Sequence, residues 1–407
     1  MDKQTNTTMR VPYGFSVHGQ EEIDAVVTVL KGNTALGDKT IEFEEKVAKM
    51  FGKEYGVMVN SGSSANLLAF ELLNLPAGTE VITPILTFAT TVAPIIQKGL
   101  VPVFVDVDPA TYVINMQQVE DAITDKTKVL MIPHLMGNIP NMEKLADLAK
   151  QHDLWLIEDS CDTLGGVYDG KPTGTYSHIS TTSFYGSHII NGAGGGGMIL
   201  VNDPKWKDRL VVLRGWGRQS SLFGEQGHSE LLENRFKTEL DGTPYDNKFI
   251  FSEIGYNLLP LELSAAFALV QLEKFPTFTK ARRDNYQRLY DFFAKHKKYF
   301  MRAEQTPKTE TIWLAFPLII NNDAPFTRLE LAMYLEDRNI QTRPVFTGNI
   351  LRQPGYKNIP HRSTQESYPN TENIMRNAFV IGSHHGLSDE QIQYLCDTFD
   401  EFLAKYN

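Results

Sequence analysis

The stretch EYGVMVNSGSSANLLAFELL, residues 54–73, places an apolar segment, a turn of small residues and an amphipathic segment in direct succession. The first segment predicts a buried strand, and the apolar positions at helical spacing in the last predict a helix. Six further strand-like segments follow before residue 204, with helical patterns between the first five strands. This alternation is typical of a mostly parallel sheet covered by helices, so we expect an α/β fold with a mixed, mostly parallel sheet of seven strands.

The pattern changes after residue 203. Helical patterns occupy residues 260–275 and 279–296, and the residues from about 308 onward suggest a smaller α/β unit. We therefore expect a large domain over residues 1–275 and a small C-terminal domain over residues 276–407. The polar, glycine-containing stretch 217–247 looks like an excursion from the core.

Composition excludes several classes of function. The 407 residues carry a net charge of -10, and no basic run could neutralise a phosphate backbone, so neither nucleic acid nor an anionic membrane is an expected partner. The chain has no apolar signal core and no run of about 18 apolar residues, which favours a cytoplasmic protein. Two cysteines, Cys161 and Cys396, share no metal-ligand spacing and are interpreted as packed thiols.

Polar residues gather where the predicted strands end, which is where ligands bind in such sheets. Ser63 and Ser64 follow the first strand and could cradle a phosphate at a helix start, or serve as an ordinary helix cap. Phe88, after the second strand, is either a core residue or a face for an aromatic ring. Asp159 ends the most apolar strand, and a buried carboxylate there needs a cation such as a protonated pyridine nitrogen.

The stretch SFYGSHIINGAGGGG, residues 183–197, combines one histidine with a glycine run. The glycines lead into a strand rather than a helix, which argues against a dinucleotide fingerprint. We expect them to let the chain turn between two strands and pass close to a flat ligand. His188 by itself is either a structural histidine or a proton acceptor.

In this order, the motifs resemble the DegT/DnrJ/EryC1/StrS sugar aminotransferases, which are fold type I pyridoxal phosphate enzymes, and the resemblance extends from about residue 11 to the C-terminus. The resemblance implies that Phe88 stacks on the cofactor ring and that Asp159 partners its nitrogen. It assigns phosphate contacts to Ser63, Ser64 and Ser183. Asn257, in GYNLLPLELSAA (residues 255–266), matches an asparagine that reaches the partner's site in this family, which implies a homodimer.

In the aminotransferases, the position of His188 holds the lysine that binds the cofactor covalently. An imidazole cannot form that bond, so pyridoxal or pyridoxamine phosphate is expected to be held non-covalently. With a histidine at this position, the chain resembles the subgroup of pyridoxamine-dependent nucleotide-sugar 3-dehydratases. The chain resembles in particular a group that acts on a CDP-linked sugar, and that group carries four iron–sulfur cysteines after the segment that corresponds to RGWGR (residues 214–218). Residues 219–236 contain none, so no cluster is expected, and glutamate should regenerate the cofactor, as in a second, GDP-specific group.

The resemblance thus implies a 3-dehydratase acting on a nucleotide-linked 4-keto-6-deoxy sugar, with His188 as its acid/base residue. It further implies that Asp162 contacts the cofactor beside its hydroxyl. Arg343 either approaches a phosphate of the nucleotide sugar or is a surface residue. An aminotransferase with a non-covalent cofactor and an inactive structural relative remain alternatives, and the nucleotide and the length of the sugar stay open.

Overall fold

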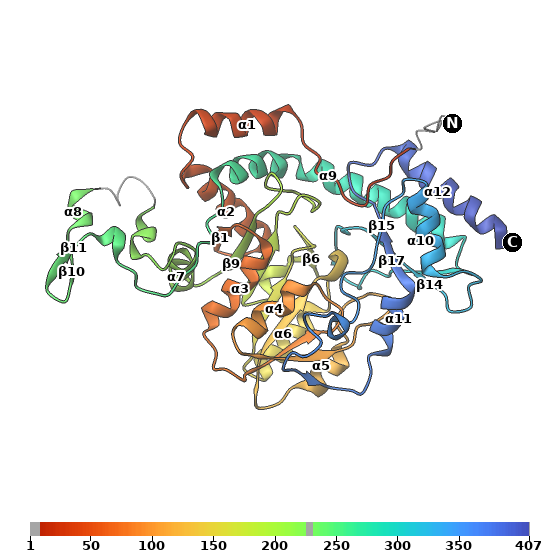
Figure 1. Ribbon diagram of the computed structural model, residues 1–407, viewed down its shortest axis with the longest axis horizontal. Helices are drawn as coiled ribbons and strands as arrows, with labels where there is room; N and C mark the ends of the chain where they lie inside the picture. The colour runs from red at the N-terminus through yellow and green to blue at the C-terminus, as the bar shows by residue number, and fades with distance from the viewer. Residues whose placement is uncertain (1–8, 225–230, 407) are drawn as a thin grey trace.

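The computed structural model describes residues 9–224 and 231–406 (Figure 1). A central eight-stranded sheet has the order β1-β9-β8-β5-β4-β2-β3-β16, in which β9 is antiparallel to both neighbours and every other pair is parallel. Seven of its strands are those predicted: β1 (Tyr55–Val59), β2 (Glu80–Pro84), β3 (Val101–Val105), β4 (Thr127–Pro133), β5 (Trp155–Asp159), β8 (Ile179–Ser183) and β9 (Gly197–Val201). The mixed, mostly parallel α/β fold is confirmed.

The prediction of seven strands omitted an eighth. Strand β16 (Arg362–Ser363) pairs in parallel with β3 at the edge of the sheet, although it comes from the C-terminal part of the chain. Its anchor is Arg362, whose Nε and Nη2 donate to the two carboxylate oxygens of Glu80 at 3.0 and 2.9 Å. A two-residue strand held by an ion pair has no apolar pattern, so nothing in the sequence indicated it.

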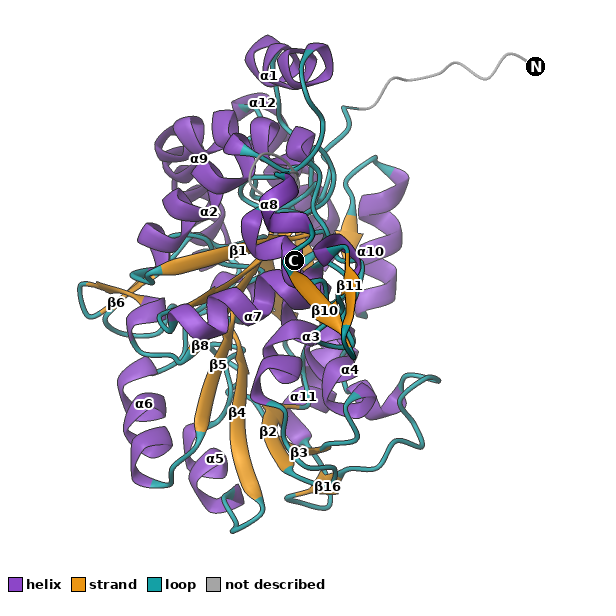
Figure 2. Cartoon of the chain, turned by 90° about the vertical axis from the view of Figure 1, so that its left-hand side faces the viewer, coloured by secondary structure: helices purple, strands orange, loops and turns teal. Residues whose placement is uncertain are grey.

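Helices cover both faces of the sheet (Figure 2). Residues alternate between faces along each strand, so Val57 and Val59 of β1 pack with one helical layer and Met58 with another. The first layer consists of α3 (Gly62–Leu73), α4 (Ala89–Gln97) and α7 (Pro204–Arg214). The opposite face is covered by α2 (Asp38–Phe51), α9 (Glu262–Ala294), α5 (Met116–Ala122) and α6 (Met142–Gln151).

Helix α9 runs from the central sheet to the C-terminal part of the chain. The two helical patterns of the sequence form one 33-residue helix that continues through Pro276, and α1 (Gln20–Lys31) packs along it (Figure 1). The C-terminal part builds an antiparallel sheet, β12 (Phe300–Arg302), β14 (Phe316–Ile320), β17 (Ala378–Ile381) and β15 (Thr342–Arg343), in that order. Its other helices are α10 (Arg328–Asp337), α11 (Pro369–Asn377) and α12 (Asp389–Leu403). A boundary at residue 275 falls inside α9, and the two-domain division stays a prediction.

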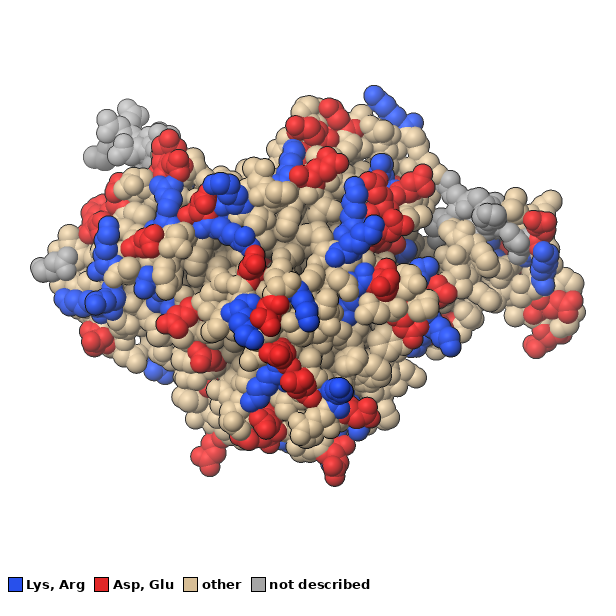
Figure 3. Space-filling view, turned by 180° about the vertical axis from the view of Figure 1, so that it is seen from behind, with Lys and Arg blue, Asp and Glu red and all other residues tan. Residues whose placement is uncertain are grey.

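The excursion after α7 extends away from the main body (Figure 1). It contains α8 (Leu232–Arg235) and the hairpin β10 (Thr238–Leu240)/β11 (Thr243–Tyr245), and residues 225–230 within it lie outside the described part. Acidic and basic side chains are interspersed over the face seen in Figure 3. No helix in the described ranges has the length and apolar character needed to span a membrane.

Candidate active site

A cavity of about 880 Å³ opens at the carboxyl ends of the sheet strands. Its wall is formed by the residues that follow β1, β2, β4, β5 and β8, together with residues 343–356 from the C-terminal part. Thr347 and Tyr356 tie that segment down: their hydroxyls donate to the carbonyls of Thr87 and Ala89 at 2.7 and 3.0 Å. The site predicted at the strand ends is therefore covered by residues 343–356, which lie more than 150 residues further along the chain than β8.

The N-terminus of α3 forms one end of the cavity. Ser61 caps this helix by accepting from the Ser64 amide at 3.1 Å, and Gly62 and Ser63 line the cavity. The Ser63 hydroxyl donates to Thr90 Oγ1 at 2.9 Å, whereas Ser64 donates to Asn60 Oδ1 at 2.6 Å and lies outside the lining. Free amides at a helix start favour an anion, so Ser63 lines an end of the cavity that suits one, whereas Ser64 belongs to the cap.

Gly62 is required by close packing at this end. A Cβ at this position would meet Cys161 Sγ and Ser183 Cβ, each at 2.7 Å. Ser183 ends β8 and lines the cavity, as does Cys161. Any larger residue at position 62 would push the helix start away from the end of β8.

Asp159, the last residue of β5, lies on the cavity floor and is 6% exposed. Its Oδ2 accepts from Asn66 Nδ2 and from Thr91 Oγ1, both at 2.8 Å, and its Oδ1 accepts from the Cys161 amide at 3.2 Å. None of the described lysines and arginines forms an ion pair with it. This buried carboxylate is fixed by neutral donors and fits a cationic ring nitrogen as the missing partner.

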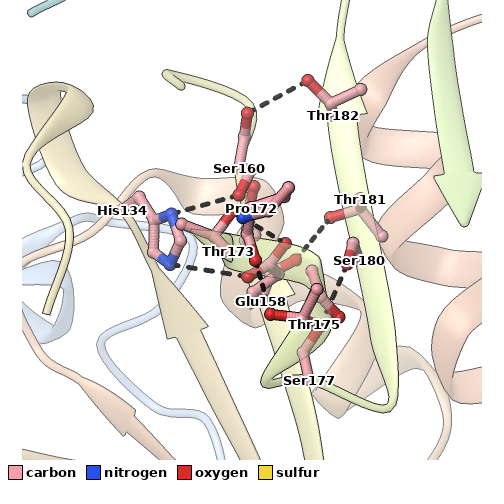
Figure 4. Close-up of polar contacts among 12 residues, drawn as sticks. His134, Glu158, Ser160, Pro172, Thr173, Thr175, Ser177, Ser180, Thr181 and Thr182 are labelled. Carbon is pink, nitrogen blue, oxygen red and sulfur yellow. Dashed lines mark hydrogen bonds and ion pairs between the residues drawn. The ribbon is translucent and has the colours of Figure 1, made fainter. Parts of the chain in front are cut away.

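A second polar cluster supports the end of β5 from behind (Figure 4). Glu158 points to the opposite face from Asp159 and accepts from Thr173 Oγ1 at 3.3 Å. Burial raises the pKa of Glu158, while the Lys53 cation opposes the shift. His134 contacts Ser160 Oγ through Nδ1 at 3.1 Å, and burial lowers the pKa of His134 to about 3, so its imidazole is neutral. These contacts support β5 between β4 and β8 on the face away from the cavity. They place no charge beside Asp159.

Asp162 lies beside Asp159 on the cavity wall and accepts from the Met136 amide at 3.0 Å. Burial, followed by the negative charge of Asp159, raises the pKa of Asp162 to about 7, and the Met136 amide opposes the shift. The two carboxylates therefore share less than two negative charges near neutral pH. Asp162 can donate a proton to a neighbouring oxygen or accept one from it.

His188 lies on the cavity wall in the turn after β8 and is partly buried. Its Nδ1 donates to the Ser183 carbonyl at 3.2 Å in the neutral tautomer, which leaves the lone pair on Nε2. Burial lowers the pKa of His188 to about 4; the Ser183 carbonyl opposes this shift, the Arg282 cation adds to it and Asp159 opposes it. The histidine is therefore neutral at pH 7 and able to accept a proton.

The glycine run turns the chain between β8 and β9, as predicted. Gly194 and Gly196 have φ of 102° and 134°, values that favour glycine, and Gly195 and Gly196 line the cavity. A Cβ on Gly197 would lie 2.2 Å from the Ser61 carbonyl carbon. The run therefore brings β9 against the start of α3.

The other predicted residues occupy different places. Phe88 is 52% exposed on the cavity wall and meets Phe346 edge-on, with ring centroids 5.9 Å apart. Arg343 also lines the cavity, and its nearest carboxylate, Glu336, is 3.9 Å away. Asn257 is exposed and does not line the cavity of its own chain.

Several residues in the site were missed from sequence. Asn66, Thr91 and Tyr13 carried no motif, although helical spacing from Ser63 puts Asn66 near the same end of α3. Arg282 was also missed: it donates to the His188 carbonyl from α9. No group of three His, Cys, Asp or Glu side chains in the described residues is placed to hold a metal ion.

Comparison with known proteins gives consistent matches. Residues 17–400 match the profile of the DegT/DnrJ/EryC1/StrS aminotransferase family. The chain is 37% identical to a dTDP-4-dehydro-2,6-dideoxy-D-glucose 3-dehydratase of Saccharopolyspora spinosa, over 97% of this chain and 86% of that protein. It is also 37% identical to the lipopolysaccharide biosynthesis protein RfbH of Salmonella typhimurium, over 98% of this chain and 92% of that protein.

A solved structure is similar along nearly the whole chain. It is a GDP-4-keto-6-deoxymannose-3-dehydratase with a trapped PLP-glutamate geminal diamine. The match has a TM-score of 0.85 and 30% identity and covers 96% of this chain and 100% of that one.

Proposed function

Because the chain belongs to the DegT/DnrJ/EryC1/StrS aminotransferase family, we propose that it is a pyridoxal/pyridoxamine phosphate-dependent 3-dehydratase. Its substrate is a nucleotide-linked 4-keto-6-deoxy sugar, and its product serves the synthesis of dideoxy sugars for surface polysaccharides. The observation that carries the proposal is His188 on the wall of a cavity whose described lining contains no lysine. A cofactor in this cavity has no amine on the wall with which to bond and is free to react from its pyridoxamine form.

The residues of the cavity fit this cofactor from end to end. The start of α3, with Ser63 and Ser183, suits the phosphate, and Asp159 suits the ring nitrogen. Phe88 offers a ring face, and Asp162 offers a carboxyl group to the hydroxyl of the ring. When bound in its pyridoxamine form, the cofactor supplies an amine for the C4 ketone of the sugar and a ring that accepts electrons.

His188 moves the protons. Its Nε2 takes up the proton that must be removed beside the amine, and it can return a proton to the C3 hydroxyl as that group leaves as water. The Ser183 carbonyl fixes the ring, so one nitrogen faces both positions without a change of tautomer. Asp159, fixed by neutral donors, partners the ring nitrogen and keeps it protonated.

Glutamate closes the cycle. Loss of the C3 oxygen reduces the sugar by two electrons, and glutamate supplies these on becoming 2-oxoglutarate, while ammonia is released on hydrolysis. An iron–sulfur route would need thiolate ligands, and the sequence has only Cys161 and Cys396. Arg343 is the one cationic side chain in the described cavity lining, so we assign it to the diphosphate of the nucleotide sugar.

Product analysis tests this function. The enzyme is incubated with CDP-, GDP- and dTDP-linked 4-keto-6-deoxy sugars and glutamate, without reductase or NADH. A 3-dehydratase gives a product lighter by one oxygen atom, with ammonia and 2-oxoglutarate in equal amounts. A product that retains nitrogen would identify an aminotransferase instead. Borohydride treatment and peptide mapping should find no pyridoxyl-lysine anywhere in the chain; a stoichiometric adduct on any lysine would contradict the role given to His188.

We further propose a homodimer in the cytoplasm, where nucleotide sugars and glutamate are available. Exposed apolar side chains concentrate around the excursion and the segment leading to α9, including Phe251, Ile254 and Leu261, which are 56%, 96% and 63% exposed. Large exposed apolar surface favours association. We assign Asn257, which is exposed and lies between Ile254 and Leu261 in the sequence, to the partner's phosphate site.

Hybrid dimers test this arrangement. His188→Asn and Asn257→Ala are each introduced into separate chains, which are then mixed by unfolding and refolding together. A shared site restores part of the activity, because one of the two sites in each hybrid holds neither change. Sedimentation of the parent as a monomer at working concentration would contradict the dimer.

A further inference from the structure

Arg282 is the largest fully buried side chain of the described residues, with 1% of its surface exposed. It lies in α9 and donates from Nε to His385 Nδ1 at 3.1 Å and from Nη1 to the carbonyls of Trp313 and Leu314 at 3.4 and 3.1 Å. Its Nη2 donates to the His188 carbonyl at 3.3 Å. One guanidinium therefore joins α9 to three separate segments, one of which carries the acid/base histidine.

The positive charge has no carboxylate counterpart. All four acceptors are neutral, and no described Asp or Glu forms an ion pair with Arg282. Burial lowers the pKa of Arg282 to about 10, so it is still a cation at neutral pH. Burying an unpaired cation costs stability, which a merely structural anchor would avoid by using a neutral donor.

The guanidinium is also held rigidly. Phe278, one helical turn before Arg282, stacks on the His385 ring with centroids 4.0 Å apart and an interplanar angle of 21°. Burial lowers the pKa of His385 to about 3, with the Arg282 cation adding to the shift, so Nδ1 stays available as an acceptor. Leu314, whose carbonyl also binds Arg282, lines the cavity. A fixed cation thus stands directly behind the cavity wall.

We propose that Arg282 is a positioning residue for the dehydratase reaction: it fixes the turn that carries His188 and places a permanent positive charge behind that histidine. The inference rests on the proposed role of His188. Loss of the bond to the His188 carbonyl would let the turn shift, and the imidazole with it. Loss of the charge would make protonation of the imidazole easier.

The charged groups around His188 come from several elements, and each raises or lowers the proton affinity of the imidazole. Asp159 at the end of β5 favours the protonated imidazole, and Arg282 in α9 disfavours it. Other titratable groups near these three are Tyr13, Cys161, Asp162, Tyr185, His384 and His385. Among the described groups, Arg282 is the one cation that bonds directly to the turn and is also buried.

The test measures the titration of His188 directly, in the cofactor-free protein. Histidine labelled with ¹³C at Cε1 is followed by NMR from pH 3.5 to 8, and the His188 signal is assigned by its absence in His188→Asn. Arg282→Gln should raise the pKa of His188 by about one unit, because a like charge is removed. The matched control is Arg283→Gln, which removes the same charge from the neighbouring, exposed position. This control should leave the titration unchanged.

Arg282→Lys separates charge from geometry. It keeps a cation but cannot donate to all four acceptors, so the His188 titration should stay low while turnover falls about tenfold or more. An unchanged titration in Arg282→Gln, or an equal shift in Arg283→Gln, would overturn the proposal. If Arg282→Gln does not fold, the test rests on Arg282→Lys. Turnover by Arg282→Lys at the parental rate would then refute the positioning role. The NMR result needs no substrate, so failure to find dehydratase activity would count against the proposed function alone.

Discussion

Asn66 donates from Nδ2 to Asp159 Oδ2 at 2.8 Å and accepts from Thr181 Oγ1 at 2.6 Å. Because Asn66 belongs to α3 and Asp159 to β5, one amide couples the end of the cavity at the start of α3 to the carboxylate on its floor. The Thr181 hydroxyl fixes which end of the amide faces the carboxylate. This buried side chain therefore links the two ends of the site directly.

Asn66→Asp should weaken retention of pyridoxal phosphate about tenfold or more. A second carboxylate beside Asp159 would repel it and favour a proton shared between the two, so the ring nitrogen loses its full negative partner. The measurement is a fluorescence titration of the cofactor-free protein. Thr91→Val is the control: it removes one neutral donor from Asp159 and should have a smaller effect. Equal affinity in Asn66→Asp and the parent would show that this coupling is unimportant.

His188→Asn should lower dehydration by about two to four powers of ten while cofactor affinity stays near that of the parent. The phosphate end, Phe88 and Asp159 do not depend on the imidazole. His152→Asn, the same change at an exposed histidine, should have no effect on rate. His188→Lys should bind the cofactor covalently, seen by absorbance, and shift the product toward an amino sugar. Near-parental dehydration by His188→Asn would mean that another residue is the base.

Asp162→Asn should stabilise the cofactor-free protein more at pH 8 than at pH 5. The folded-state pKa of Asp162 is raised from 3.8 to about 7, so the folded protein retains a proton that the unfolded chain releases between these values. Stability therefore falls as pH rises toward 7, and asparagine removes this loss. Thermal unfolding at both pH values measures it, with the exposed Asp125→Asn as control. An equal change in Tm at the two pH values would contradict the raised pKa.

Gly62→Ala should weaken cofactor binding more than it weakens the fold. The added methyl would meet Cys161 Sγ and Ser183 Cβ at 2.7 Å and force the start of α3 away from β8. Affinity for inorganic phosphate and for pyridoxal phosphate should fall together, because both occupy the same amides. Gly32→Ala, whose added methyl makes only ordinary contacts, serves as the control. Unchanged phosphate affinity in Gly62→Ala would place the anion site elsewhere.

The sequence could predict the site wherever a local pattern marks it. The seven long strands, the small residues before α3, and Asp159 at a strand end all follow from apolar runs and from where they stop. Ser64 shows the limit of such reasoning. It belongs to the same motif as Ser63, yet its hydroxyl donates to Asn60, its amide donates to the cap oxygen of Ser61, and it stays out of the cavity lining. One residue of difference along a helix is a rotation of 100°.

By itself, the sequence determined the alternation of strand and helix, the places where ligands could bind, and the absence of thiolates for a cluster. These are properties of short segments, in which side-chain type and spacing decide the outcome. Only the tertiary structure decided that Arg282, nearly a hundred residues from His188, lies behind it, that Asn66 holds Asp159, and that residues 343–356 close the cavity. Such contacts join segments distant along the chain. They depend on how helices and loops pack over a sheet, which no local pattern encodes.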